Sequence, residues 1–435
     1  MKQQFFKYVS QNVGGMIGIS VYILADTFFI SISGGANGIT VLNLVLPLYG
    51  LIYAIGAMIG IGSATRHAIY KAQGEQGIDF YLTHSLTWQM IFSLPFILIG
   101  LINPGAYLAF MGGDLNIVSL GMDYVRIVFF GTPFFMMQFT FTAFARNDNA
   151  PTIAMAASLG GSLFNIIFDY VFMFPLDMGM AGAALATAMS PVVTILITVL
   201  HYAGKRCTLH IQWEMPTISR LLSCCQLGVS AFVGEIASAI TTTVFNFLLL
   251  RIMGNIGVAA YGVVANWSLV VMSVFNGVAQ GTQPLLSRSY GCGKHDEVKI
   301  LLKLGLITNV IVEMVVILGA WSMTEVMVSL FNSEGNQLLA ELAGDGMRFY
   351  FLGYLLAGVN IMFVTYFAAT DQSCFATVAS LLRGAVAITV CAVIMSTILG
   401  MNGVWLSFLA SETITFGVVI CMMWMQKRGI AYEKK

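Results

Sequence analysis

Acidic side chains occur inside apolar, helix-length runs of this chain, where they could bind an ion. Asp26 lies in the second half of the run GMIGISVYILADTFFISI at 15–32. A carboxylate at the centre of a bilayer costs at least ~2.5 kcal/mol, so such a residue normally faces a protein interior or a watery cavity and has a function there. Asp26 is therefore the first candidate for a functional residue.

A second polar group lies in the motif F-N-I-I-F-D-Y, where Asn165 and Asp169 are four residues apart and so share one helical face. Two acids and an amide could together hold a cation or share a proton. A carboxyl group removed from water takes up a proton more readily. Tyr22, one turn before Asp26, is a candidate hydrogen-bond partner, and Thr187 could add a hydroxyl. Alternatively, Asp169 lies near the end of its run and simply reaches water.

The second half of the chain also carries polar residues in apolar runs. Glu235 either lines a cavity or makes structural hydrogen bonds. Gln280 and Gln283 likewise either line a cavity or join helices. For Glu313 and Glu412 we favour a structural role.

The composition places the chain in a membrane. Of its 435 residues, 58% are hydrophobic and 9% are charged, and the mean hydropathy is +0.85. Soluble domains carry about 25% charged residues. The formal net charge is zero, which gives no field that would attract nucleic acid. The seven cysteines lack CxxC spacing, and we interpret them as packing residues.

Runs of about 20 apolar residues, the length that crosses the hydrocarbon core, occur twelve times in the sequence. We therefore expect an all-α integral membrane protein, and the first run is expected to be retained as a helix. The predicted spans are 12–32, 40–65, 83–103, 123–144, 151–173, 180–202, 223–250, 257–283, 300–320, 347–369, 374–399 and 402–425.

Positive residues predict the orientation, because cytoplasmic loops retain Lys and Arg. Only Arg126, Arg251 and Arg348 fall on the side opposite the N-terminus, each near a helix end. The other seventeen of the twenty are assigned to the N-terminal side, which predicts cytoplasmic termini. They are Lys2, Lys7, Arg66, Lys71, Arg146, Lys205, Arg206, Arg220, Arg288, Lys294, Lys299, Lys303, Arg383, Lys427, Arg428, Lys434 and Lys435.

The chain contains an internal repeat. The segment 60–74 aligns without gaps on 277–291, with glycines matching at both ends. The polar stretch 204–220 separates the copies, so we predict a six-helix bundle at 1–203, a cytoplasmic linker at 204–220 and a second six-helix bundle at 221–435. Repeats of this kind are typical of transporters that hold substrate between their halves.

Four motifs together resemble the multidrug and toxic compound extrusion family, in particular its DinF-like branch. They are YILADTFFIS at 22–31, FNIIFDYVF at 164–172, AGAALAT at 181–187 and VAQGTQPLLSRSYG at 278–291. The resemblance covers nearly the whole chain. It implies a V-shaped pair of six-helix bundles that exports organic cations and other xenobiotics in exchange for H⁺ or Na⁺.

By this resemblance Asp26 is the coupling acid of the first helix, and Asn165 and Asp169 are the pair on the fifth. Thr187 completes a cation site for H⁺ or Na⁺, with Tyr22 beside it. No other cofactor is expected. The chain lacks the second-half acid pair of the sodium-coupled NorM-like branch, which favours a coupling site in the first half.

The alternative transporter is a flippase for lipid-linked precursors, which would hold pyrophosphate with a central Arg or Lys. The cations here lie at expected helix ends, except that the place of Arg383 is ambiguous. An enzyme is disfavoured because the five histidines lie at helix ends or in loops and no HExxH, GxSxG or P-loop motif occurs. We expect a monomer in the plasma membrane that binds small organic, often cationic, molecules.

Overall fold

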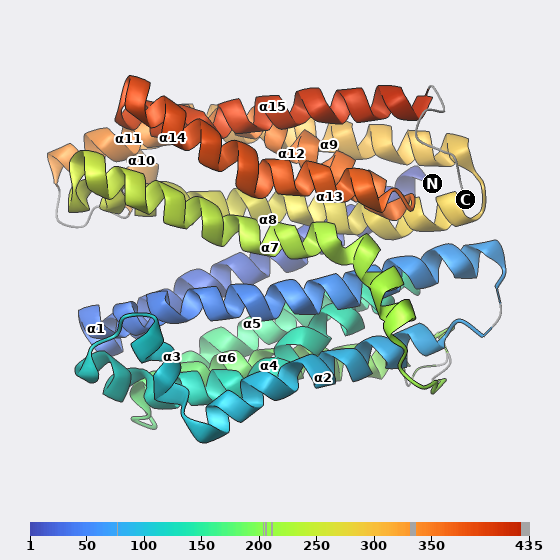
Figure 1. The fold of residues 1–435 in the computed structure, drawn as a ribbon, viewed down its shortest axis with the longest axis horizontal. Coiled ribbons are helices and arrows are strands. Elements are labelled where there is room, and N and C mark those ends of the chain that lie inside the picture. The colour runs from blue at the N-terminus through green and yellow to red at the C-terminus, as the bar shows by residue number, and fades with distance from the viewer. Residues whose placement is uncertain (76, 203, 205–206, 210–211, 331–335, 428–435) are drawn as a thin grey trace.

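The protein is built from long helices in two bundles (Figure 1). The structure, a computed structural model, describes residues 1–427 except 76, 203, 205–206, 210–211 and 331–335. These residues contain no strand, which confirms the all-α prediction. Of the cations used to predict the orientation, Lys205, Arg206, Arg428, Lys434 and Lys435 lie outside the described residues.

The lower bundle in Figure 1 contains α1 to α6. Their bounds are α1 (Lys2–Gln73), α2 (Phe80–Ile102), α3 (Pro104–Phe110), α4 (Leu115–Asn147), α5 (Pro151–Met173) and α6 (Gly179–Tyr202).

The upper bundle contains α7 to α15. A π-helical turn, η1, lies between α13 and α14. The bounds are α7 (Ile218–Met253), α8 (Asn255–Gly291), α9 (His295–Ser322), α10 (Thr324–Ser329), α11 (Gln337–Phe351), α12 (Tyr354–Ala369), α13 (Ser373–Leu381), η1 (Leu382–Val386), α14 (Ala387–Leu399) and α15 (Met401–Lys427). The predicted linker 204–220 covers the connection between α6 and α7 and overlaps the start of α7 at 218–220. Its role as a boundary between the bundles stays a prediction.

Twelve candidate spans account for these helices except the short α3 and α10. Helix α1 holds the first two, Lys2–Gly35 and Asn37–Gln73, which meet where Gly35 has φ 54° and ψ −147°. Only glycine adopts such a conformation without strain. Within the described residues eleven helices are long and apolar enough to cross a membrane, and α11 and α12, bent by 46°, form a twelfth. The tenth span is therefore broken rather than continuous as predicted.

Local sequence explains where several helices begin and end. Asp114 caps α4 by accepting a hydrogen bond from the backbone N–H of Ile117 at 2.8 Å. Pro151 opens α5, where its missing N–H costs nothing. Gly74 ends α1 in the left-handed conformation. These signals fix the lengths of the helices that carry the site.

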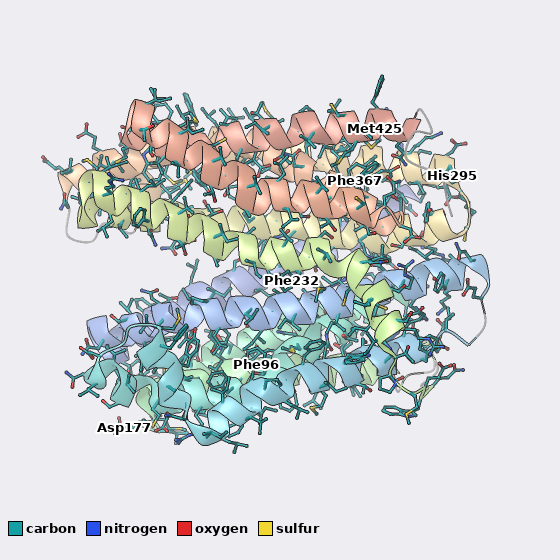
Figure 2. The ribbon with its side chains drawn as sticks, in the orientation of Figure 1. Phe96, Asp177, Phe232, His295, Phe367 and Met425 are labelled. Carbon is teal, nitrogen blue, oxygen red and sulfur yellow. The ribbon has the colours of Figure 1, made fainter. Side chains whose placement is uncertain are left out.

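Helix α1 begins and α15 ends at the same end of the molecule (Figure 1). We call this the terminal end and the opposite one the far end. Side chains of α7, such as the half-buried Phe232, lie between the two bundles (Figure 2).

Candidate functional site: a buried carboxyl pair

The two acids predicted from the first half meet between α1 and α5. Asp26 is 8% exposed and Asp169 is fully buried. Their carboxyl groups are close enough to interact electrostatically. Oδ1 of Asp26 and both oxygens of Asp169 receive no donor from the described residues. Two carboxylates this close repel unless a proton or a cation lies between them.

Asn165 and Thr187 extend this cluster toward α6. The Asn165 side-chain N–H donates to the Thr187 hydroxyl at 3.2 Å. Oδ1 of Asn165 is buried and lacks a donor among the described residues. Buried polar atoms are usually hydrogen-bonded. Four acceptor oxygens without donors are therefore a set that a hard cation such as Na⁺, or a proton on the acids, would satisfy.

Small residues bring the three helices close enough to build the cluster. A Cβ on Gly18 of α1 would lie 2.5 Å from the Leu159 side chain of α5. A Cβ on Gly161 of α5 would lie 3.0 Å from the backbone oxygen of Ser190 in α6. Close approach of membrane helices commonly depends on such residues. The glycines therefore set the spacing between the helices that carry Asp26, Asp169 and Thr187.

Tyrosines surround the carboxyl pair, and only one of them was predicted. Tyr22 is half-buried and close enough to Tyr53 and to both acids to interact with them electrostatically. Tyr124 is also close enough to the acids to interact electrostatically, and its hydroxyl lies 3.3 Å from that of Tyr49. The spacing of Tyr49 and Tyr53, one turn apart in the second span, is a signal that the sequence analysis missed.

The second-half candidates divide into two groups. Glu235 of α7 is half-buried and close enough to Tyr22 and Tyr53 to interact with them, so it faces the first bundle near the site. Gln280 is half-buried. Gln283 is buried, and its side-chain N–H donates to the hydroxyl of Thr65 in α1, so it joins the two bundles.

Glu313 and Glu412 have structural partners, as favoured above. Glu313 accepts the backbone N–H of Val359 at 3.0 Å. Glu412 accepts the Asn360 side chain at 2.7 Å and forms an ion pair with Arg383, Nε to Oε1, at 2.8 Å. The side chains of Glu412 and Arg383 are 1% and 14% exposed.

Arg383 was counted with the cations on the N-terminal side, although its place was ambiguous, and the structure shows that it does not lie at that end. Arg383 lies in η1, inside the span Ser373–Leu399, about midway along it. A charge is retained there because Glu412 neutralises it. π-helical turns are uncommon and occur often at functional sites.

The bundles are joined at the terminal side of the carboxyl pair. Arg66 of α1 pairs with Asp371, in the loop after α12, at 2.9 Å, and donates to the backbone oxygen of Ser223 in α7 at 2.9 Å. Arg288 of α8 donates to Asn149, in the loop after α4, at 3.1 Å. Each bundle thus provides an arginine that hydrogen-bonds to a residue of the other bundle.

Backbones of the two bundles also touch. A Cβ on Gly62 would lie 2.2 Å from the carbonyl oxygen of Cys224 in α7. A Cβ on Gly228 of α7 would lie 1.9 Å from the carbonyl oxygen of Met58 in α1. Ser20 and Ser273 form a hydrogen bond nearer the site. The structure is therefore closed at the terminal end.

Known proteins resemble this chain over almost its full length. The MatE family model matches residues 13–171 and 231–398. "Multidrug export protein MepA" of Staphylococcus saprophyticus is 25% identical over 429 residues, which cover 98% of this chain and 94% of that protein. The protein of the same name from Staphylococcus aureus strain N315 is 26% identical and covers 92% of this chain and 88% of its own.

Solved structures show the same fold. "Crystal structure of MATE in complex with MaL6" matches with a TM-score of 0.91 and 20% identity, covering 98% of this chain and 96% of that one. "Outward-facing conformation of a multidrug resistance MATE family transporter of the MOP superfamily" matches with a TM-score of 0.89 and 21% identity, covering 97% and 96%. These matches confirm the expected arrangement of twelve spans.

Proposed function

Because the chain belongs to the MatE family, we propose that it is a secondary active multidrug transporter that exports organic cations and other xenobiotics in exchange for H⁺ or Na⁺. The names of its relatives support multidrug export. The observation that carries the proposal is the buried carboxyl pair, three of whose four oxygens lack donors among the described residues.

We assign the coupling step to Asp26 and Asp169. Without a proton or cation, the two charges repel, which favours separation of α1 from α5. With one bound, the carboxyl groups draw together and Asn165 and Thr187 can complete the oxygen set. An ion shifts a conformational equilibrium only if it binds the two states with different affinity. The dependence of the Asp26–Asp169 contact on the position of α1 supplies that difference.

Substrate is proposed to enter the space between the bundles near Tyr22, Glu235 and Gln280. Glu235 gives this space a negative charge that suits an organic cation. Aromatic faces such as Tyr22 also attract organic cations. Gln283 is better explained by its bond to Thr65 than by substrate contact.

The terminal end is proposed to be cytoplasmic, in the plasma membrane, with the transporter as a monomer. Eleven described cations, apart from that of Arg383, belong to positions toward this end, and Arg126, Arg251 and Arg348 lie at or near the far end. The eleven are Lys2, Lys7, Arg66, Lys71, Arg146, Arg220, Arg288, Lys294, Lys299, Lys303 and Lys427. This asymmetry is what the positive-inside rule expects of cytoplasmic loops. The structure then represents a state closed to the cytoplasm.

A flippase for lipid-linked precursors is less well supported. Such a protein needs a free cation in its central cavity to hold pyrophosphate. Arg383 is the described cation at mid-span, and Glu412 already neutralises it.

The test is dye efflux from vesicles with an imposed pH or Na⁺ gradient. Asp26→Asn removes the ionisable group at nearly constant shape and should abolish gradient-driven efflux while the protein still inserts. Asp177→Asn is the matched control, because Asp177 is exposed in the loop before α6, and it should export as wild type does. Wild-type export by Asp26→Asn would refute the coupling role. The gradient that drives efflux identifies the ion.

A further inference from the structure

A second polar cluster lies at the terminal end of the first bundle, away from the carboxyl pair. Asp148 follows the last residue of α4, and its side chain is fully buried. His201 lies in the last turn of α6, and Cys207 lies in the segment between α6 and α7. One ligand atom from each of these three residues lies within 4.8 Å of the other two. Three separate chain segments thus bring a carboxylate, an imidazole and a thiol together.

We propose that Asp148, His201 and Cys207 form a binding site for a borderline divalent transition-metal ion, with Zn²⁺ as the expected occupant. One oxygen, one nitrogen and one sulfur ligand suit Zn²⁺, whereas Mg²⁺ and Ca²⁺ take oxygen ligands. Three protein ligands leave a fourth tetrahedral position for water or another small ligand.

The geometry requires little movement. Nε2 of His201 lies 2.9 Å from Oδ2 of Asp148, and a proton joins them. Tetrahedral Zn²⁺ with bonds of about 2.0–2.1 Å to nitrogen and oxygen would hold these two atoms about 3.3 Å apart. The ion would replace that proton, since metal binding releases protons from its ligands. Cys207 Sγ must approach, and it lies in a connecting segment rather than in a helix.

The Asp148 carboxylate is held in place by its neighbours. It accepts hydrogen bonds from Thr208 and His201, and the charge of Lys71 lies beside it. The backbone N–H of Thr208 donates to Oδ2 at 3.0 Å, and its hydroxyl donates to Oδ1. These bonds orient the carboxylate as partners around metal ligands commonly do.

Lys71 is the cation that competes with the metal. Its Nζ lies 3.6 Å from Oδ1 of Asp148 and donates to the Thr208 hydroxyl at 2.6 Å. The side chain is 40% exposed, so it can swing into water when a divalent ion binds. Removing its charge should tighten metal binding by about tenfold, because a repulsion of the size typical for partly exposed charges is lost.

The consequence would be to fasten the segment after α6 to the first bundle. Cys207 and Thr208 lie in that segment, and Asp148 lies in the loop that also carries Asn149, the partner of Arg288. An ion at this place would therefore join the connection between the bundles to a loop that holds them closed. This site does not depend on the proposed transport function.

The test is a titration of the purified full chain, first stripped with a chelator, with Co²⁺ as a spectroscopic substitute for Zn²⁺. We expect a thiolate-to-cobalt charge-transfer band and tetrahedral d–d bands, and their loss when Zn²⁺ displaces Co²⁺. Cys207→Ser should remove the charge-transfer band and weaken Zn²⁺ binding by at least about 100-fold. Cys292→Ser changes an exposed thiol outside the cluster and should leave both unchanged.

Lys71→Gln keeps the three ligands and serves as the second variant. It should bind Co²⁺ more tightly than wild type. Absence of the charge-transfer band in the wild-type chain, or equal loss in Cys207→Ser and Cys292→Ser, would show that the cluster is only a hydrogen-bond network around Asp148 and would overturn the proposal. Weaker binding in Lys71→Gln would contradict the proposed competition.

Discussion

The contact between Gly228 and Met58 gives a sharp prediction about the closed terminal end. Replacing Gly228 with Ala adds one methyl group where the two bundles meet. The added Cβ would lie 1.9 Å from the Met58 carbonyl oxygen, whereas ordinary contact begins at 3.4 Å, so the backbones must separate by about 1.5 Å. Both atoms belong to rigid positions of helices, so a change of rotamer cannot relieve the clash.

The magnitude follows from this geometry. Overpacking costs about 1–3 kcal/mol, and a clash against backbone belongs at the upper end. The higher helix propensity of Ala acts equally in both conformations while α7 stays helical, so it does not offset this cost. A cost of about 2–3 kcal/mol should shift the equilibrium away from the closed terminal end about 30- to 150-fold. Gly234→Ala is the matched control, because Gly234 lies on the same helix and a Cβ there meets nothing within 4 Å.

The assay is a distance distribution between two spin labels at the terminal end, one in each bundle. Glu75→Cys and Lys299→Cys in a background without other cysteines provide exposed positions for them. Gly228→Ala should add a population with a longer distance, and Gly234→Ala should match the unsubstituted protein. Identical distributions for the two alanine variants would refute the inference that this glycine permits closure.

Two further predictions concern ion pairs. Arg383→Gln should lower the free energy of unfolding by about 3–5 kcal/mol, because Glu412 is left buried without its partner. The double variant Arg383→Gln with Glu412→Gln should recover most of this loss. Equal melting temperatures for the wild type and Arg383→Gln would contradict this prediction. The Arg66–Asp371 pair is more exposed at Asp371, where the side chain is 38% exposed, so a double-mutant cycle with Ala should give a coupling free energy of only about 1 kcal/mol. A coupling near zero would show that this pair does not hold the bundles together.

Most of the fold could be predicted from the sequence because membrane spans are fixed by length and apolar composition. The bend between α11 and α12 could not be predicted. The two helices together form one apolar run long enough to cross the membrane, and no proline marks the break at 352–353. The place of Arg383 was ambiguous, because it falls inside the predicted span 374–399 and was also counted with the cations of the N-terminal side. Only the three-dimensional structure shows that Glu412, 29 residues away in sequence, neutralises it inside the span.

The carboxyl cluster was partly predictable. The spacing of Asn165 and Asp169 placed them on one face, and the structure brings Asp169 to Asp26 and Asn165 to Thr187. The roles of these residues stay predictions. Cys207 was interpreted as a packing residue, because its sequence distance from Asp148 hid the contact that the ends of α4 and α6 create.

The closeness of Asp26 and Asp169 has a consequence for energetics. In the proposed mechanism the two carboxyl groups share a single H⁺ or Na⁺, since like charges that interact do not titrate independently. One turn of the proposed cycle would then trade one monovalent ion for one substrate molecule. When the substrate carries a single positive charge, no net charge crosses the bilayer, and the membrane voltage would neither drive nor oppose the exchange.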